Sequence, residues 1–252
     1  MKESGKVAAF FDLDGTVIAP PSLEFRFAAY LARRGELRGA AVFSWLGDLL
    51  KAGMKALVTR GGTSARLKAL DENKSYLAGV REQAAAEWAR EKVTQIECYA
   101  DALARIEWHR EQSHSIFFVS GTLAPLARAL AKRIARGDEI GVFATEMQSF
   151  AGVWTGCAAG ASVCGAAKAS AVRDLAARHE IDLEHSYAYG DSLSDRWMLA
   201  AVGNATAVNP GARLMWLARR RGWRVANWSR VEPGFEIMPE AAKRQIPRWE
   251  KS

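Results

Sequence analysis

The chain has 252 residues, of which 49% are hydrophobic and 25% charged, so it can form one large domain or two modest ones with a sizeable core. No uncharged apolar run approaches the roughly 18 residues of a membrane span, and acidic residues follow the first apolar run too closely for a signal peptide. The three cysteines, at 98, 157 and 164, have neither metal-ligand spacing nor an even disulfide framework, so we expect a reduced, cytoplasmic setting.

The net charge of +7 makes a nucleic-acid or membrane-surface partner worth considering. The positive side chains, however, are spread along the expected helices and mixed with glutamates, and the densest cluster, at 218–224, is short. This pattern favours a solvated surface with some attraction for anionic metabolites. We therefore expect no nucleic-acid partner, no membrane span, and a monomer or a homodimer.

The first expected element is a buried strand over residues 6–13, rich in β-branched and aromatic side chains. From about 22 to 112 the apolar residues recur with the helical period, in segments at 23–34, 42–58 and 77–96, and no strand is expected. These residues predict an all-helical cap over 18–112, inserted after the first strand.

Strands and helices alternate in the second half of the chain, which is typical of a parallel sheet covered on both faces. Strands are expected at 114–122, 139–145, 186–192, 205–210 and 223–228, helices at 125–137, 166–180, 194–203 and 212–222, and a hairpin at 146–156. The prediction is an α/β fold with a doubly wound, Rossmann-like parallel sheet, built from 1–17 and 113–230, with a C-terminal tail at 231–252.

Polar residues end three of these strands. Asp12 and Asp14 end the first, Ser120 and Gly121 lie at the end of the strand at 114–122, and Asp191 lies at the end of the strand at 186–192. Because ligands bind at the carboxyl ends of strands in open parallel sheets, we expect one shared site. Neighbouring carboxylates repel each other, and a divalent cation held by hard oxygen ligands would relieve that repulsion.

Phosphoryl transfer is a chemistry that such a set could perform. An aspartate can attack phosphorus, a second acid can protonate the leaving group, and a hydroxyl such as Ser120 with a lysine such as Lys168 can balance the phosphoryl charge. Each of these residues taken alone could instead have a purely structural role, as a helix cap or as a solvated side chain.

The segments DLDGT (12–16), VSGT (119–122), AAKAS (166–170) and GDSLSD (190–195) together resemble the four ordered motifs of the haloacid dehalogenase superfamily of phosphatases. The helical insertion and the last motif resemble its phosphoserine-phosphatase-like branch, subfamily IB. The resemblance covers about residues 7–228, nearly the whole chain.

This resemblance implies a role for each matching residue. Asp12 would be the nucleophile and a Mg²⁺ ligand, and Asp14 would be the general acid/base, with its backbone carbonyl also reaching the metal. Ser120 and the N–H of Gly121 would bind the phosphoryl group. The remaining implied roles are charge neutralisation by Lys168, metal binding by Asp191, orientation of Lys168 or of a metal-bound water by Asp195, and weaker phosphate-side parts for Thr16 and Asn209.

The function expected from the sequence is a Mg²⁺-dependent phosphatase that hydrolyses a small phosphorylated metabolite through an aspartyl-phosphate. Two alternatives stay open at this point. One is a phosphotransferase that passes the phosphoryl group to an alcohol. The other is a non-catalytic, basic nucleic-acid-binding module.

Overall fold

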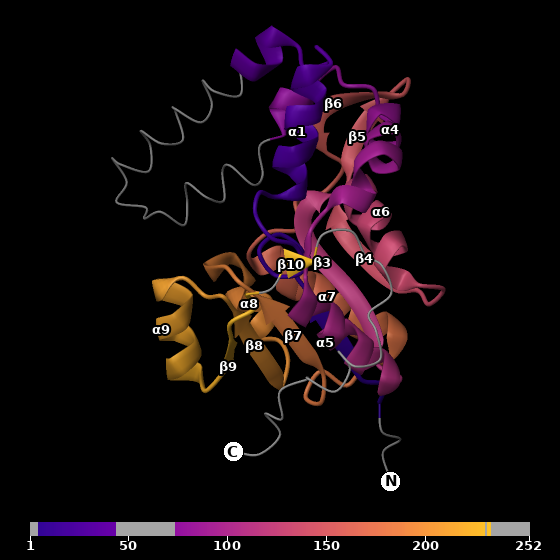
Figure 1. Ribbon diagram of the computed structural model, residues 1–252. Helices are drawn as coiled ribbons and strands as arrows, with labels where there is room; N and C mark the ends of the chain where they lie inside the picture. Colours follow the sequence, from indigo (N-terminus) through magenta and orange to yellow (C-terminus); the bar gives the residue numbers. More distant parts are fainter. Residues whose placement is uncertain (1–4, 44–73, 230, 233–252) are drawn as a thin grey trace, which may run out of the picture.

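The computed structural model describes residues 5–43, 74–229 and 231–232. Most of the helix expected over 42–58, and the expected tail beyond 232, lie outside these residues. Figure 1 shows a twisted sheet with helices on both faces, and above one end of the sheet a smaller group that contains α1, α4, β5 and β6.

The sheet has six strands in the order β4-β3-β1-β7-β8-β9, and every neighbouring pair is parallel, which confirms the expected α/β class. Its strands are β1 (Ala8–Phe11), β3 (Ser115–Leu123), β4 (Ile140–Thr145), β7 (Tyr187–Gly190), β8 (Asn204–Val208) and β9 (Arg224–Ala226). The chain leaves β1 for one side of the sheet through β3 and reaches the other side through β7. This reversal of strand order beside β1 is where open α/β sheets bind ligands, at the carboxyl ends of the strands.

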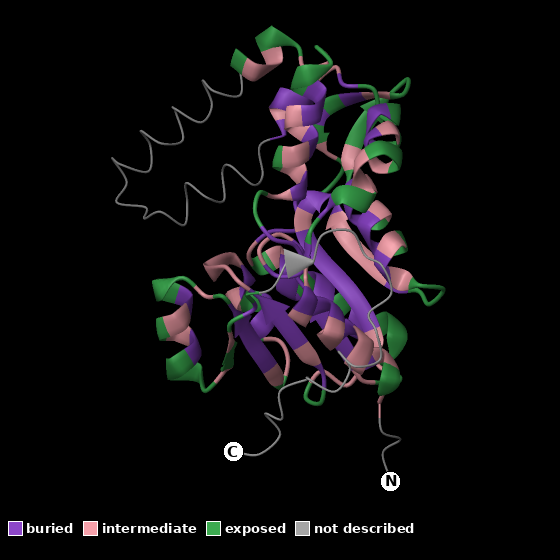
Figure 2. Ribbon diagram, viewed as in Figure 1, coloured by how far each residue is buried: buried purple, intermediate pink, exposed green. Residues whose placement is uncertain are grey.

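Helices cover the sheet on both faces, so β1 is buried throughout and its neighbours β3 and β7 are mostly buried, as Figure 2 shows. Phe10 and Phe11 of β1 point to opposite faces, since adjacent residues of a strand alternate. Phe10 stacks on Phe117 at 5.5 Å between ring centroids, and Phe11 stacks on Tyr189 at 4.5 Å. The apolar core on the Phe10 face includes α7 (Ala166–His179), α8 (Arg196–Leu199) and α9 (Ala212–Arg221), and the core on the Phe11 face includes α5 (Ala100–Glu111) and α6 (Ala124–Ala135).

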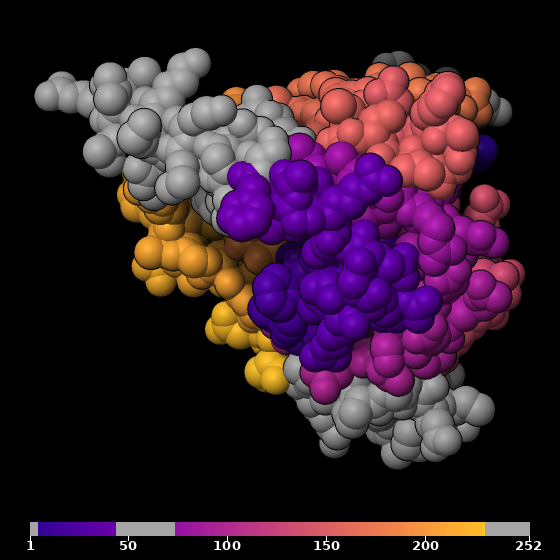
Figure 3. Space-filling model, turned by 90° about the horizontal axis from the view of Figure 1, so that it is seen from above, coloured from indigo at the N-terminus to yellow at the C-terminus, as the bar shows by residue number. Residues whose placement is uncertain are grey.

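The smaller group is built from separate stretches of chain, which Figure 3 shows side by side in indigo, magenta and salmon. Phe27 of α1 (Leu23–Arg33) packs edge-on against Trp88 of α4 (Gln83–Lys92) at 6.1 Å and against Trp154 of β6 (Val153–Ala158) at 6.0 Å. Strand β6 pairs with β5 (Met147–Phe150) in the expected hairpin. The hairpin from the second half of the chain therefore completes the core of the group that α1 and α4 begin.

The expected helix over 77–96 is shorter than predicted. The 3₁₀ helix η1 (Ser75–Leu77) comes first, α4 begins only at Gln83, and η2 (Val93–Gln95) follows it. In between, Gly79 has a φ of +88° and its N–H donates to the Trp154 carbonyl at 2.9 Å, while the Trp154 N–H donates to the Val80 carbonyl at 2.8 Å. The helical period correctly predicted a helix over 83–92. In the turn before it, backbone groups bond to the hairpin instead of to one another, so the helix does not extend back to 77.

The expectation of no strand between 22 and 112 was wrong. Strand β2 (Cys98–Tyr99) pairs antiparallel with β10 (Val231–Glu232), which lies in the expected tail. Two residues are too few for an alternating pattern, and the partner strand is far away in the sequence, so neither strand has a local signal. The helix expected over 194–203 is likewise reduced to the 3₁₀ helix η3 (Leu193–Asp195) and α8.

Among the described residues, no helix combines the length and the apolar character needed to cross a lipid bilayer.

Candidate active site

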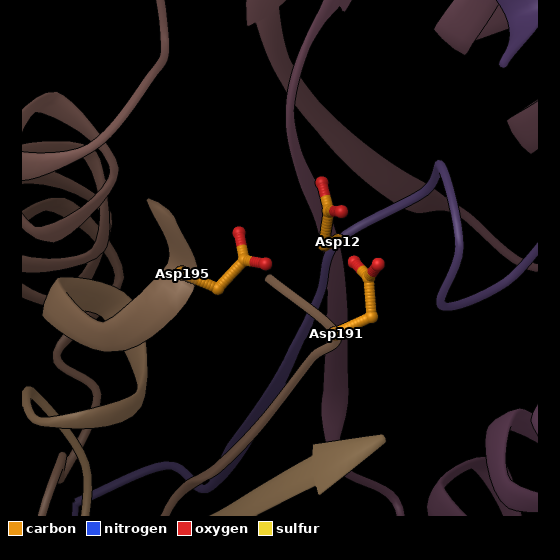
Figure 4. Close-up of side chains that lie close together, drawn as sticks. All are labelled: Asp12, Asp191 and Asp195. Atoms are coloured by element: carbon orange, nitrogen blue, oxygen red, sulfur yellow. The ribbon is translucent and has the colours of Figure 1, made fainter. Parts of the chain in front are cut away.

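The carboxylate of Asp12 meets two carboxylates from far along the sequence, those of Asp191 and Asp195, at the carboxyl edge of the sheet (Figure 4). Asp12 follows β1, Asp191 follows β7, and Asp195 lies in η3. One oxygen of each carboxylate lies within 4.8 Å of one oxygen of each of the others. Asp12 and Asp195 are buried and Asp191 is half-buried. The sheet topology therefore brings together residues that the sequence placed only at separate strand ends.

The turn after β1 is held close to Asp191. The N–H groups of Val17 and Ile18 donate to the Leu13 carbonyl at 2.8 and 2.9 Å, which closes the chain into a tight turn. Gly15 has a φ of +86°, and a side chain there would collide with the Asp191 carboxylate. The Thr16 hydroxyl donates to Oδ1 of Asp191 at 3.3 Å. Glycine is therefore required here both by the backbone conformation and by the approach of the two segments.

Asp14 is fixed by the helix that follows it. Its Oδ1 accepts the N–H of Leu23, the first residue of α1, at 2.7 Å. A carboxylate at a helix N-terminus satisfies a backbone donor that has no partner within the helix. Asp14 and Asp12 line the same cavity, so Asp14 is held beside Asp12 at the site.

Lys168, in the first turns of α7, joins two of the acids. Its Nζ lies 2.6 Å from Oδ1 of Asp12 and 2.5 Å from Oδ1 of Asp195. The other oxygen of Asp195 accepts both the N–H of Ser192, at 2.9 Å, and its hydroxyl, at 2.7 Å. Both oxygens of Asp195 are thus occupied, and this residue serves to hold the lysine in place.

Burial and mutual repulsion shift the pKa of these groups. Burial raises the pKa of Asp12 well above its usual value, Lys168 opposes the rise, and Asp195 and Asp191 add to it. Burial raises the pKa of Asp191 to about 7, with a further contribution from Asp195. Burial also raises the pKa of Asp14 to about 6, against the hydrogen bond from Leu23. For Lys168, burial lowers the pKa, but the two carboxylates beside it raise it by more, so the lysine stays charged.

The donor set fits a small, hard divalent cation. The carboxylates of Asp12, Asp14, Asp191 and Asp195 lie around Lys168, whose ammonium group contacts two of them, so this cluster has an excess of negative charge. Mg²⁺ takes oxygen ligands and usually only one or two carboxylates. Because Asp195 is occupied by Lys168 and Ser192, the oxygens left to hold a metal are those of Asp12 and Asp191.

The segment after the bend in β3 supplies hydroxyl groups. The pairing of β3 with β4 shifts register between Ser120 and Leu123, so the strand bulges where Ser120, Gly121 and Thr122 reach the cavity. The Ser120 hydroxyl accepts the N–H of Thr122 at 3.3 Å. The Thr122 hydroxyl is buried and has no hydrogen-bond partner among the described residues. A buried hydroxyl without a partner is costly, and a ligand oxygen at this edge would satisfy it.

A cavity of about 880 Å³ connects these groups. Of the residues implied by the sequence motifs, those that line it are Asp12, Asp14, Ser120, Gly121, Lys168 and Asp191. Asp195 and Thr16 are fully buried beside it and act on the lining residues. Asn209 is not part of the lining: its side chain accepts the N–H of Trp228 and donates to the Trp228 carbonyl, both at 2.8 Å.

Several lining residues had not been singled out as parts of the site. Thr122 belongs to the second motif, VSGT. Its hydroxyl, two residues after Ser120, was a sequence feature that could have marked it as part of the site. Lys74, which directly precedes η1, and Tyr76 of η1 line the cavity together with Glu24 of α1. Their position depends on how η1 packs against α1 and β6, so no local pattern marks them.

The comparisons with known proteins agree with this geometry. The family model for haloacid dehalogenase-like hydrolases matches residues 9–200. A curated relative is phosphoserine phosphatase SerB1 of Mycobacterium tuberculosis, 31% identical over 264 residues, an alignment that spans 95% of this chain and 74% of the relative.

Two solved structures illustrate the shared fold. A protein of unknown function from Bordetella pertussis Tohama I has a TM-score of 0.69 at 24% identity, covering 90% of this chain and all of that one. A phospho-aspartyl intermediate analogue of phosphoserine phosphatase has a TM-score of 0.60 at 17% identity, covering 90% of this chain and 95% of that one. Because the family model matches residues 9–200, well over half of the sequence, this chain belongs to the haloacid dehalogenase-like hydrolases, and its relatives and structural neighbours include phosphoserine phosphatases.

Proposed function

We propose that the protein is a Mg²⁺-dependent phosphatase that hydrolyses a small phosphomonoester through an aspartyl-phosphate on Asp12. The observation that carries the proposal is the position of Lys168, whose ammonium group bridges Asp12 and Asp195 at the wall of the cavity that Ser120 and Asp191 also line. A buried lysine in this position holds the attacking carboxylate and neutralises phosphoryl oxygens with the same group.

In the first half-reaction the carboxylate of Asp12 attacks phosphorus. Oδ1 is bonded to Lys168, so the other oxygen, Oδ2, is the attacking atom. A new bond forms between this oxygen and phosphorus while the ester P–O bond breaks. The leaving alkoxide takes a proton from Asp14, whose carboxyl group is held in place by the N–H of Leu23.

In the second half-reaction Asp14, now a carboxylate, accepts a proton from a water molecule that attacks phosphorus. The bond between phosphorus and Asp12 breaks, inorganic phosphate leaves, and Asp14 is protonated again. The hydroxyl groups of Ser120 and Thr122 and the ammonium of Lys168 bind the phosphoryl oxygens in both steps.

Asp12 and Asp191 would hold Mg²⁺, which when bound supplies positive charge against the phosphoryl oxygens. Thr16 orients Asp191 through its hydroxyl. The backbone carbonyl of Asp14 would be a third oxygen ligand of the metal. The substrate class proposed here is a phosphorylated small metabolite with an alcohol leaving group.

The test is release of inorganic phosphate from p-nitrophenyl phosphate and from a panel of phosphorylated metabolites, with Mg²⁺ and with a chelator. We expect Asp12→Asn to lower kcat by at least about 10⁴-fold without loss of fold. Acid-quenched wild-type enzyme should carry one added phosphoryl group on the peptide that contains Asp12. Asp174→Asn, which removes an exposed carboxylate from the same helix as Lys168, is the matched control and should leave the rate unchanged. Full activity of Asp12→Asn would refute the mechanism.

A further inference from the structure

A second group of charged side chains lies in the wall of the cavity, apart from the acids at the sheet edge. The Nζ of Lys74 lies 2.5 Å from Oε2 of Glu24, and the hydroxyl of Tyr76 donates to Oε1 of Glu24 at 2.5 Å. Lys74 is only 3% exposed, and the Glu24 side chain is 18% exposed. All three residues line the cavity. A lysine buried to this extent on a cavity wall is unusual unless it is paired, and here it is paired.

This group lies next to the proposed general acid. Glu24 directly follows Leu23, whose N–H binds Asp14. Lys74 and Glu24 also act on the Asp14 carboxyl with opposite sign, since Glu24 raises its pKa and Lys74 lowers it. A leaving group that takes its proton from Asp14 therefore extends toward Glu24 and Lys74.

The pair presents no net charge to that leaving group. Both oxygens of Glu24 already accept strong hydrogen bonds, from Lys74 and Tyr76, so the carboxylate has its charge compensated. An ammonium group entering here would meet Lys74, and a carboxylate would meet Glu24. Either charge would also lose its hydration without gaining an uncompensated partner from this pair.

Apolar side chains lie beside this ion pair. Phe25, Ala28, Leu37 and Val42, all from α1 and the chain that follows it, line the same cavity. Two arginines, Arg196 and Arg213, line it from the elements that follow β7 and β8. Arg196 is engaged by the Leu193 carbonyl at 2.7 Å and lies over the ring of Trp197, and Arg213 is exposed.

We propose that the Glu24–Lys74 ion pair is a specificity-determining element that selects phosphomonoesters with an uncharged leaving group. The inference rests on the phosphatase function proposed above and names its substrate class. Neutral hydroxyl groups can exchange hydrogen bonds with the pair, while a leaving group with a full charge at this position is disfavoured.

The test uses three phosphomonoesters of similar size that differ in the charge of the leaving group: 2-hydroxyethyl phosphate (neutral), phosphoethanolamine (ammonium) and phosphoglycolate (carboxylate). For the wild-type enzyme we expect kcat/KM to be highest for the neutral ester, by about tenfold over each charged one. Phosphoserine is added as a fourth ester because its leaving group carries both charges. A wild-type preference for phosphoethanolamine, phosphoglycolate or phosphoserine over the neutral ester would overturn the proposal.

Two single substitutions should shift this preference in opposite directions. Lys74→Met leaves Glu24 uncompensated and should raise kcat/KM for phosphoethanolamine about tenfold relative to the neutral ester. Glu24→Gln leaves Lys74 uncompensated and should do the same for phosphoglycolate. The double variant, Glu24→Gln with Lys74→Met, should return to the neutral preference. If kcat/KM changed by the same factor for all three esters in each single variant, the ion pair would have only a structural role, and the proposal would be overturned.

The controls separate this inference from the proposed function. Lys74→Arg keeps the charge and should keep the wild-type preference, and circular dichroism establishes that each variant is folded. If a single variant does not fold, the wild-type ranking of the four esters decides the proposal. Activity on p-nitrophenyl phosphate with the wrong ranking refutes only the selectivity, whereas no phosphate release from any ester refutes the proposed function and this inference with it.

Discussion

Lys168 Nζ lies 2.6 Å from Oδ1 of Asp12, although the two residues are 156 positions apart in the sequence. The same ammonium group is held from its other side by Asp195, whose second oxygen is fixed by Ser192. Lys168 is therefore held between two buried carboxylates, and its hydrogen bond to Oδ1 of Asp12 is the reason that the proposed mechanism assigns the attack to Oδ2.

Replacing Lys168 with Met should damage both catalysis and stability. Asp12 and Asp195 would lose their shared cation in a buried environment, and the phosphoryl group would lose a positive partner. We expect kcat to fall by about 10²–10³-fold and the free energy of unfolding to fall by about 3 kcal/mol in the absence of metal. Steady-state kinetics and urea unfolding measure the two effects. Lys132→Met, at an exposed position on α6, should change neither.

Thr122 offers a way to separate binding from folding. Its buried hydroxyl has no partner among the described residues, so Thr122→Val should leave the free energy of unfolding unchanged or slightly higher. If the hydroxyl binds a phosphoryl oxygen, KM should rise by about tenfold.

The matched control is Thr145→Val. The Thr145 hydroxyl donates to the Gly121 carbonyl at 2.9 Å and accepts the N–H of Val163 at 3.2 Å. Its removal should lower the free energy of unfolding by about 1–3 kcal/mol. An unchanged KM in Thr122→Val would exclude Thr122 from phosphate binding.

Metal binding should be visible in thermal unfolding. In the wild-type protein Tm should rise with Mg²⁺ concentration, because the metal binds only the folded state. Asp191→Asn should abolish this rise. Without metal the variant should be at least as stable as the wild-type protein, since burial and Asp195 raise the pKa of Asp191 to about 7 and disfavour its charged form. A full Mg²⁺-dependent rise in Asp191→Asn would place the metal elsewhere.

A buried histidine should make stability depend on pH outside the active site. His109 is fully buried, its Nε2 lies 2.9 Å from the Tyr189 hydroxyl and its Nδ1 lies 2.8 Å from Nδ1 of His114. Burial, with repulsion from His114 and Arg105, lowers the pKa of His109 from 6.5 to about 2. Between these two values the unfolded chain binds a proton that the folded chain does not, so stability rises with pH across this range and is lost as pH falls below about 6.5.

The difference between two proteins isolates this effect. Urea unfolding of the wild-type protein and of His109→Gln is compared at pH 7, 6 and 5. In the wild-type protein His109 adds up to about 1.4 kcal/mol per pH unit to the slope of the free energy of unfolding against pH. His109→Gln should lack this contribution, while its side-chain amide still offers the Tyr189 hydroxyl a hydrogen-bond partner. Parallel curves would contradict the burial of a neutral histidine.

The strand ends and their polar residues could be predicted from the sequence because each has a local cause. Glycine permits the turn after Asp14, acids follow apolar runs, and parallel strands send their carboxyl ends to one edge. The contact between Lys168 and Asp12 needed the resemblance to known motifs, since a lysine among alanines in a helix has no local signal of its own.

What could not be predicted depends on partners that are distant in the sequence. Residues 79–82 leave the helical pattern because the β5–β6 hairpin takes part of their backbone hydrogen bonds, and β2 pairs with β10, which lies far along the chain. Asn209 matched a weak phosphate-side position but is bonded to Trp228 instead. Lys74 reaches the cavity wall only through the packing of α1 and η1, so its pairing with Glu24 is a property of the tertiary structure alone.

The position of β1 in the middle of the sheet has a consequence for biosynthesis. Strand β1, which Asp12 directly follows, is translated more than half a chain before its neighbour β7 and before Lys168, Asp191 and Asp195. A nascent polypeptide released before β7 would hold the proposed nucleophile without the groups that position it. In the proposed mechanism, a translation product that ends before β7 would therefore have no activity toward phosphate esters.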